Sequence, residues 1–116
     1  MPRAPDSHSL PLRPAVYHIL LALTRGDRHG LGIADQVDRV SEGAVELGPG
    51  TLYRSLSEMA EAGLIEAVRS PRPDADPRRK YYSITLRGRD LLARETERLG
   101  RLVDTARAHG ALAEKA

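Results

Sequence analysis

The sequence contains no cysteine, which excludes disulfide bonds, thiol catalysis and cysteine-based zinc sites. Phe and Trp are absent as well, and the chain has four Tyr. A hydrophobic core must therefore consist mainly of Leu, Ile, Val and Ala. The longest apolar run, residues 19–23, is far too short to span a membrane, so we expect no membrane partner.

The first twelve residues mix Arg, Asp, His and Pro and lack the apolar stretch of a signal peptide. We expect residues 1–12 to form a flexible tail and the protein to be cytoplasmic. The whole chain of 116 residues is long enough for one domain with one core, but not for two independent domains. Its 41% hydrophobic and 29% charged residues are typical of a globular protein.

Three helices are predicted in the first half of the chain. Apolar residues recur at helical spacing over residues 14–25, 30–41 and 49–62, and proline occupies the first position of the first and third segments. Gly63 is well placed to end the third helix in a left-handed conformation. A short extended strand is expected between the second and third helices, at residues 45–47.

The pattern then changes to two β-like runs, residues 64–68 and 80–84, on either side of a loop with three prolines. Two such runs predict a β-hairpin. The order helix, helix, short strand, helix, hairpin is typical of a helix-turn-helix followed by a β-wing. We therefore expect a winged helix-turn-helix domain over residues 13–84, in a fold that is mainly α with a small β-hairpin.

A last helix is expected over residues 85–109, capped by Thr85, with a flexible tail at residues 110–116. Its apolar residues recur at spacings of seven and three, as in a short coiled-coil seam. A helix of ~20 residues is about 30 Å long, more than a small winged helix can cover. We therefore prefer a C-terminal dimerisation helix over one that packs only on its own domain. The expected dimer interface consists of Leu92, Leu99, Leu102, Val103 and Ala106.

The start of the third helix is the first candidate binding surface. Its apolar residues Leu52 and Leu56 turn inward, which leaves short polar side chains and one Arg outside. Such side chains at a helix N-terminus suit reading of bases in the major groove, and the free backbone N–H groups attract phosphate. The predicted contacts are Thr51, Tyr53, Arg54 and Ser55. Tyr53 could reach a base or a phosphate, and a merely solvated surface is the alternative.

The loop of the hairpin, residues 69–80, is the second candidate surface. It has five basic and two acidic residues, while the whole chain has a net charge of only +2. Basic side chains beside a helix-turn-helix can neutralise phosphates or enter the minor groove, whereas an isolated charged loop is more often only solvated. The predicted DNA-binding residues here are Arg69, Arg72, Arg78, Arg79 and Lys80.

Two other classes of function are weighed against DNA binding. A winged-helix adaptor would bind a partner protein with the third helix, but it has little use for basic residues in the wing. An enzyme is not expected, because no phosphate-binding loop or nucleophile motif occurs. The four histidines form no pair at metal-ligand spacing, so we expect neither a metal nor a cofactor. His18 is expected to be a structural or surface residue. His29 beside Asp27 weakly suggests a metal ligand, but we expect it to be only part of a turn.

Three segments resemble the PadR-like transcriptional regulators: HGLGIADQV from His29, GPGTLYRSLSEMAEAGLIE from Gly48, and RRKYYSITLRGRDLL from Arg78. The resemblance implies a winged-helix fold, a dimer joined by C-terminal helices, and repression at a palindromic promoter site. It also places Thr51, Tyr53 and Arg54 at the DNA, with the wing beside them. Some relatives bind planar drugs between aromatic side chains at the dimer interface, but this chain lacks Trp. Whether it has a small-molecule effector stays open.

Overall fold

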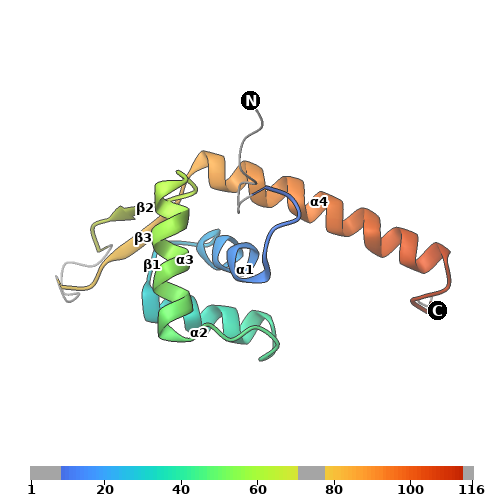
Figure 1. Cartoon of the computed structure of the whole chain (residues 1–116), viewed down its shortest axis with the longest axis horizontal. Coiled ribbons are helices and arrows are strands. Elements are labelled where there is room, and N and C mark those ends of the chain that lie inside the picture. The colour runs from blue at the N-terminus through green and yellow to red at the C-terminus, as the bar shows by residue number, and fades with distance from the viewer. Residues whose placement is uncertain (1–8, 71–77, 114–116) are drawn as a thin grey trace.

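The computed structural model describes residues 9–70 and 78–113. Within these residues, three helices and three short strands form one body, and a fourth helix runs along it and beyond it (Figure 1). In chain order the elements are α1 (Pro14–Leu23), β1 (Arg28–His29), α2 (Gly30–Val40), α3 (Pro49–Glu61), β2 (Ile65–Val68), β3 (Tyr81–Ile84) and α4 (Leu86–Ala108).

The core lies where the apolar stripes of the first three helices meet, as the helical spacing predicted. Each predicted helix is confirmed, with ends that differ by at most two residues. Removal of a Leu, Ile or Val side chain from water stabilises the fold by about 1.5–3 kcal/mol. The residues of α1–α3 that are at most 1% exposed are Val16, Ile19, Leu20, Leu23, Ile33, Val37, Leu52, Leu56 and Met59.

The predicted hairpin is confirmed, but it belongs to a three-stranded antiparallel sheet with the order β1-β3-β2. The third strand is not residues 45–47, where we expected one. It is β1, in which Arg28 pairs with Tyr82. The amide of Val45 bonds instead to the Ser41 hydroxyl at 3.0 Å, so the segment folds back on the end of α2. Its partly buried apolar side chains pack on the core rather than in a sheet.

A tight junction joins the hairpin to α4. The Thr85 hydroxyl accepts a hydrogen bond from the amide of Gly88 at 3.0 Å and donates one to the carbonyl of Gly63 at 2.6 Å. The predicted cap is thereby confirmed, and Gly63 has the predicted positive φ of 78°. Gly88 must be small, because a Cβ there would collide with the carbonyl oxygen of Leu64. These contacts fix the direction in which α4 leaves the sheet.

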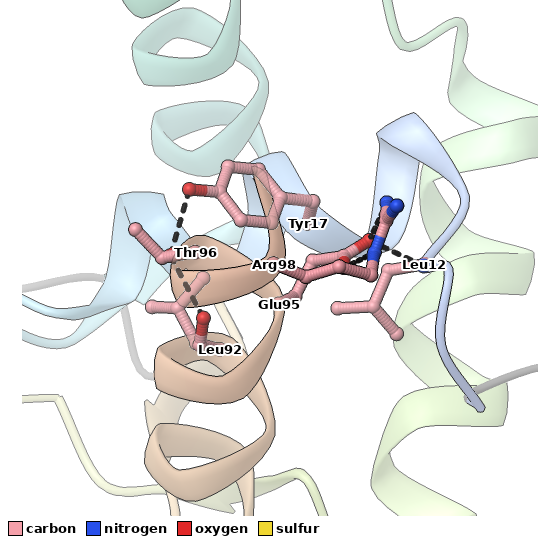
Figure 2. A network of polar contacts seen from close by, with 6 residues as sticks. All are labelled: Leu12, Tyr17, Leu92, Glu95, Thr96 and Arg98. Atoms are coloured by element: carbon pink, nitrogen blue, oxygen red, sulfur yellow. Dashed lines mark hydrogen bonds and ion pairs between the residues drawn. The ribbon is translucent and has the colours of Figure 1, made fainter. Parts of the chain in front are cut away.

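The chain before α1 is fastened to α4 by a buried carboxylate. Glu95 is 2% exposed and accepts the backbone N–H of Leu12 at 2.7 Å. It also accepts two hydrogen bonds from Arg98, at 2.5 and 3.1 Å (Figure 2). Leu12 is only 8% exposed, so the expected tail over residues 1–12 is wrong at its C-terminal end. Residues 1–8 lie outside the described part of the chain.

Candidate nucleic-acid interface

The N-terminus of α3 is uncapped and exposed. No side chain in the described part of the chain caps it with a hydrogen bond, and no acidic residue stands in its first turn. Backbone N–H groups in such a turn carry a partial positive charge and attract anions. Thr51 and Arg54 lie three residues apart on the exposed face of this helix, and neither side chain forms a hydrogen bond or ion pair within the described residues. Both side chains are therefore available to an external ligand.

Ser55 corrects our expectation for this surface. We expected it to be exposed, but it is only 7% exposed. It lies three residues after Leu52 and four before Met59, so it shares their buried face. The pattern of apolar residues did not indicate that Ser55 is buried, because serine is not counted among the apolar residues. The exposed polar face at the start of α3 is thus formed by Thr51, Tyr53 and Arg54.

The base of the wing brings the described basic residues together. Val68 pairs with Tyr81, so Arg69 and Lys80 lie just beyond this pair at the same end of the hairpin. Arg69, Arg78, Arg79 and Lys80 are all exposed, as predicted. Arg72 lies outside the described residues.

A cleft of about 260 Å³ separates the base of the wing from α2 and α3. The walls of this cleft include residues of both predicted binding surfaces, the start of α3 and the wing. The lining residues are His29, Gly30, Leu31, Tyr53, Arg78, Arg79, Lys80 and Tyr82.

His29 stands at the centre of the polar contacts in this cleft. Its Nδ1 accepts the amide N–H of Gly32 at 3.1 Å and thereby caps α2, and its Nε2 lies 2.9 Å from a guanidinium nitrogen of Arg79. Its ring meets that of Tyr81 edge to face at 5.4 Å. Burial, and secondly the charge of Arg79, lower the pKa of His29. The imidazole is therefore neutral at neutral pH. We expected only a turn here; a histidine directly before a helical stretch is the signal that could have indicated the cap.

Two tyrosines complete the cleft. The ring of Tyr53 lies across Gly30, since a Cβ on this glycine would be 3.1 Å from Tyr53 Cε1. Tyr82 is 8% exposed, and burial, then the neighbouring Tyr53, raise its pKa. Its hydroxyl therefore keeps its proton at neutral pH and can donate a hydrogen bond. Sequence reasoning missed Tyr82, because a tyrosine in a strand is usually only a core residue.

Other kinds of site find no support in the described residues. Residues 9–70 and 78–113 hold no group of three or more His, Asp or Glu side chains that could bind a metal ion. None of the helices found there combines the length and the apolar character needed to cross a membrane.

Comparison with known proteins identifies the family. Residues 19–94 match the model of the transcriptional regulator PadR-like family. The chain belongs to this family. Its members are transcriptional regulators, so this PadR-like protein is a regulator and not an enzyme.

Solved structures agree with this assignment. A PadR family transcription regulator from Clostridium difficile is 28% identical, with a TM-score of 0.69 over 86% of this chain and 100% of the other. A PadR-like regulator from Bacillus cereus shares the fold at 23% identity, with a TM-score of 0.68 over 85% and 92% of the two chains.

An uncharacterized 37.1 kDa transposon protein from Streptomyces fradiae is 35% identical over 84 residues; the match spans 72% of this chain but only 22% of that protein.

Helix α4 of this PadR-like protein carries the predicted dimer surface. Leu92 does not belong to that surface, because it is 7% exposed and forms part of the chain's own core. Leu102 and Val103 are 51% and 45% exposed, and Leu99 and Ala106 are half-buried. Beyond Glu95, no residue of α4 is buried by the described part of the chain. The described residues thus leave four of the five predicted interface residues available to a partner.

Proposed function

We propose that this PadR-like protein binds double-stranded DNA with the start of α3 in the major groove and the wing on the adjacent backbone. The observation that carries the proposal is the exposed pair Thr51 and Arg54, whose side chains have no partner in residues 9–70 and 78–113, at a helix terminus that attracts anions. The basic base of the wing lies beside it, across the cleft. A helix with its N-terminal residues at base edges is the usual docking mode of helix-turn-helix proteins.

The start of α3 contacts bases, and the wing contacts the DNA backbone. Arg54 can form a bidentate pair with a guanine, and the hydroxyl or methyl group of Thr51 can meet a base edge. The wing residues Arg69, Arg79 and Lys80 contact phosphates, which give affinity but carry no sequence information. Tyr53 lies against Gly30 inside the cleft, which favours the phosphate over the base as its contact.

The dimer and the form of the operator are part of the same proposal. A second copy covers the exposed or half-buried apolar residues in the second half of α4, which are Leu99, Leu102, Val103 and Ala106. Two-fold symmetry then requires an inverted repeat, with half-sites about one helical turn or a multiple of it apart. Occupation of such a site in a promoter would repress transcription.

Substitution of Arg54 tests the role of α3. The variant Arg54→Ala should lose ~1–3 kcal/mol of binding free energy per half-site and relax the preference at one symmetric pair of positions. Binding to a library of substituted operators is measured for both proteins. The variant Arg101→Ala, an exposed arginine on α4, is the matched control and should bind like the wild type.

Two outcomes would contradict this role of Arg54. An equal loss of affinity on every DNA sequence would show that Arg54 contacts phosphate and not a base. Unchanged binding would show that the start of α3 does not contact DNA. The protein would then be better described as a protein–protein adaptor.

A further inference from the structure

We propose that the cleft between the wing and α2 is a binding site for one phosphate of the DNA backbone, held by His29, Arg79 and the hydroxyls of Tyr53 and Tyr82. The inference rests on the proposed function, because it assumes that α3 and the wing face DNA. It adds two residues, His29 and Tyr82, that the sequence did not indicate, and it gives the cleft one defined ligand.

The first argument is an unmatched hydrogen bond at His29. Both ring nitrogens lie against donors: Nδ1 against the amide of Gly32, and Nε2 against the guanidinium of Arg79. A neutral imidazole accepts at one nitrogen only, because the other carries the proton, and a guanidinium only donates. Whichever tautomer forms, the ring N–H faces another donor, which is either the amide of Gly32 or the guanidinium of Arg79. In the tautomer that caps α2, with Nδ1 accepting from Gly32, the contact between His29 and Arg79 is therefore unsatisfied in the protein alone.

An anion between the two side chains removes this conflict. With the proton on Nε2, His29 keeps the bond from Gly32 and donates to the anion, while the exposed Arg79 donates from the other side. Hydrogen bonds from such donors to a charged oxygen are shorter and stronger than neutral ones. The cleft thus has two donors in place for an acceptor that the described residues do not supply.

The second argument is independent and comes from Tyr82. Its side chain is more than nine-tenths buried and lines the cleft, yet its hydroxyl has no hydrogen bond in residues 9–70 and 78–113. The hydroxyl of a largely buried tyrosine usually has a hydrogen-bond partner, so this hydroxyl is left for a ligand of the cleft. Tyr53 adds a second hydroxyl without a hydrogen bond in the same ranges. No carboxylate lines the described walls of the cleft, so an anion meets no repulsion there.

The place of the cleft identifies the anion. One strand of the DNA backbone separates the major groove from the neighbouring minor groove. If α3 enters the major groove and the wing lies on the far side of that strand, the backbone must cross the space between them, and this space is the cleft. A phosphodiester oxygen is therefore the ligand we assign to it, in preference to free phosphate.

Two conservative variants test the site. Tyr82→Phe removes the hydroxyl and keeps the buried ring, and His29→Asn keeps an acceptor that caps α2 but removes Nε2. Each should bind an operator duplex about tenfold more weakly, the usual effect of a lost hydrogen bond to a charged group, with unchanged base preference. Tyr17→Phe is the control, since its hydroxyl bonds Thr96 away from the cleft. Thermal unfolding of each variant separates lost folding from lost binding.

Duplexes with a single neutral methylphosphonate locate the phosphate. At one position per half-site, this replacement should weaken the wild type about tenfold and Tyr82→Phe by clearly less, because the variant has already lost one hydrogen bond to that phosphate. If no position behaves in this way while inorganic phosphate raises the melting temperature of the wild type but not of Tyr82→Phe, the cleft binds a free anion and the assignment to DNA is wrong.

The inference and the proposed function fail in different ways. If the wild type binds DNA with the expected Arg54 dependence, but Tyr82→Phe and His29→Asn bind as tightly as the wild type, the phosphate site is refuted and the proposed function stands. If the wild type binds no DNA, the proposed function itself is refuted.

Discussion

The two halves of α4 belong to one continuous helix but have opposite surroundings. The first half, Leu86–Glu95, contains all of its buried residues, which are Gly88, Leu92 and Glu95. In the second half, residues 96–108, the described chain buries no side chain, and the helix projects away from the domain (Figure 1). The first half is held by tertiary contacts. In the described chain, the polar contacts of the second half after the bond between Thr96 and Tyr17 at its start are its own helical hydrogen bonds and ion pairs within α4.

This difference shows what a helix needs in order to persist in water. Isolated helices shorter than ~12–15 residues are marginal, and most helical stability in proteins comes from packing of an apolar face. The second half has 13 residues and an apolar stripe without a partner in the described chain. A second copy of the chain would supply the missing packing. Three predictions test this contrast, two through the free energy of unfolding and one through the assembly of the chain.

The largest effect is expected for Leu92→Ala, in the first half. Truncation of a buried Leu leaves a cavity and costs about 2–5 kcal/mol of unfolding free energy. Leu102→Ala, the same change in the second half, should cost clearly less at a protein concentration low enough to dissociate the proposed dimer. Urea denaturation at one protein concentration measures both, since a dimer makes stability depend on concentration. Equal costs would show that the two halves are packed alike.

A smaller effect is expected for Glu95→Gln, about 1–3 kcal/mol, because the neutral amide weakens the hydrogen bonds that this buried group accepts from Arg98 and from the N–H of Leu12. The control Glu97→Gln, at an exposed position, should change little. Glu95 also makes the stability depend on pH. The hydrogen bond from Arg98, helped by the N–H of Leu12, lowers its pKa in the folded state in spite of its burial.

The direction of the pH effect follows from this shift. At pH values between the folded-state pKa and the ordinary 4.5, the unfolded chain binds more protons, so stability falls as the pH falls. The advantage of the wild type over Glu95→Gln should be complete above pH 4.5 and shrink as the pH drops through the folded-state pKa. Denaturation curves at a series of acidic pH values measure it. A constant advantage over the whole series would refute the role assigned to this carboxylate.

The smallest effect on the folding of a single chain is expected for Leu102→Asp. The side chain is already half exposed, so the domain itself should remain folded, but a charge in the proposed interface would separate the two copies. Ala108→Asp introduces the same charge nine residues after Leu99, on the opposite side of the helix, and should stay dimeric. Sedimentation measures the assembly. A wild type that is monomeric at micromolar concentration would contradict the dimer.

The sequence predicted the elements better than their partners. Helical spacing and proline positions located α1, α2 and α3, and the change of period located the hairpin. The strand β1 was missed because two residues, Arg28 and His29, have no periodicity, and they are extended only because β3 lies beside them. Ser55 and Leu92 were misplaced for a related reason, since a helical stripe does not reveal how far around the helix its neighbours reach.

The sequence by itself determined the order of helices and strands, the basic wing, the polar start of α3 and the membership in the PadR-like family, because these depend on local spacing and residue type. Only the tertiary structure decided that Glu95 holds the chain before α1, that Leu92 belongs to the core, and that His29, Tyr53, Arg79 and Tyr82 line one cleft. These features join residues far apart in the chain. No local pattern contains them, since they depend on how the packed elements are placed against one another.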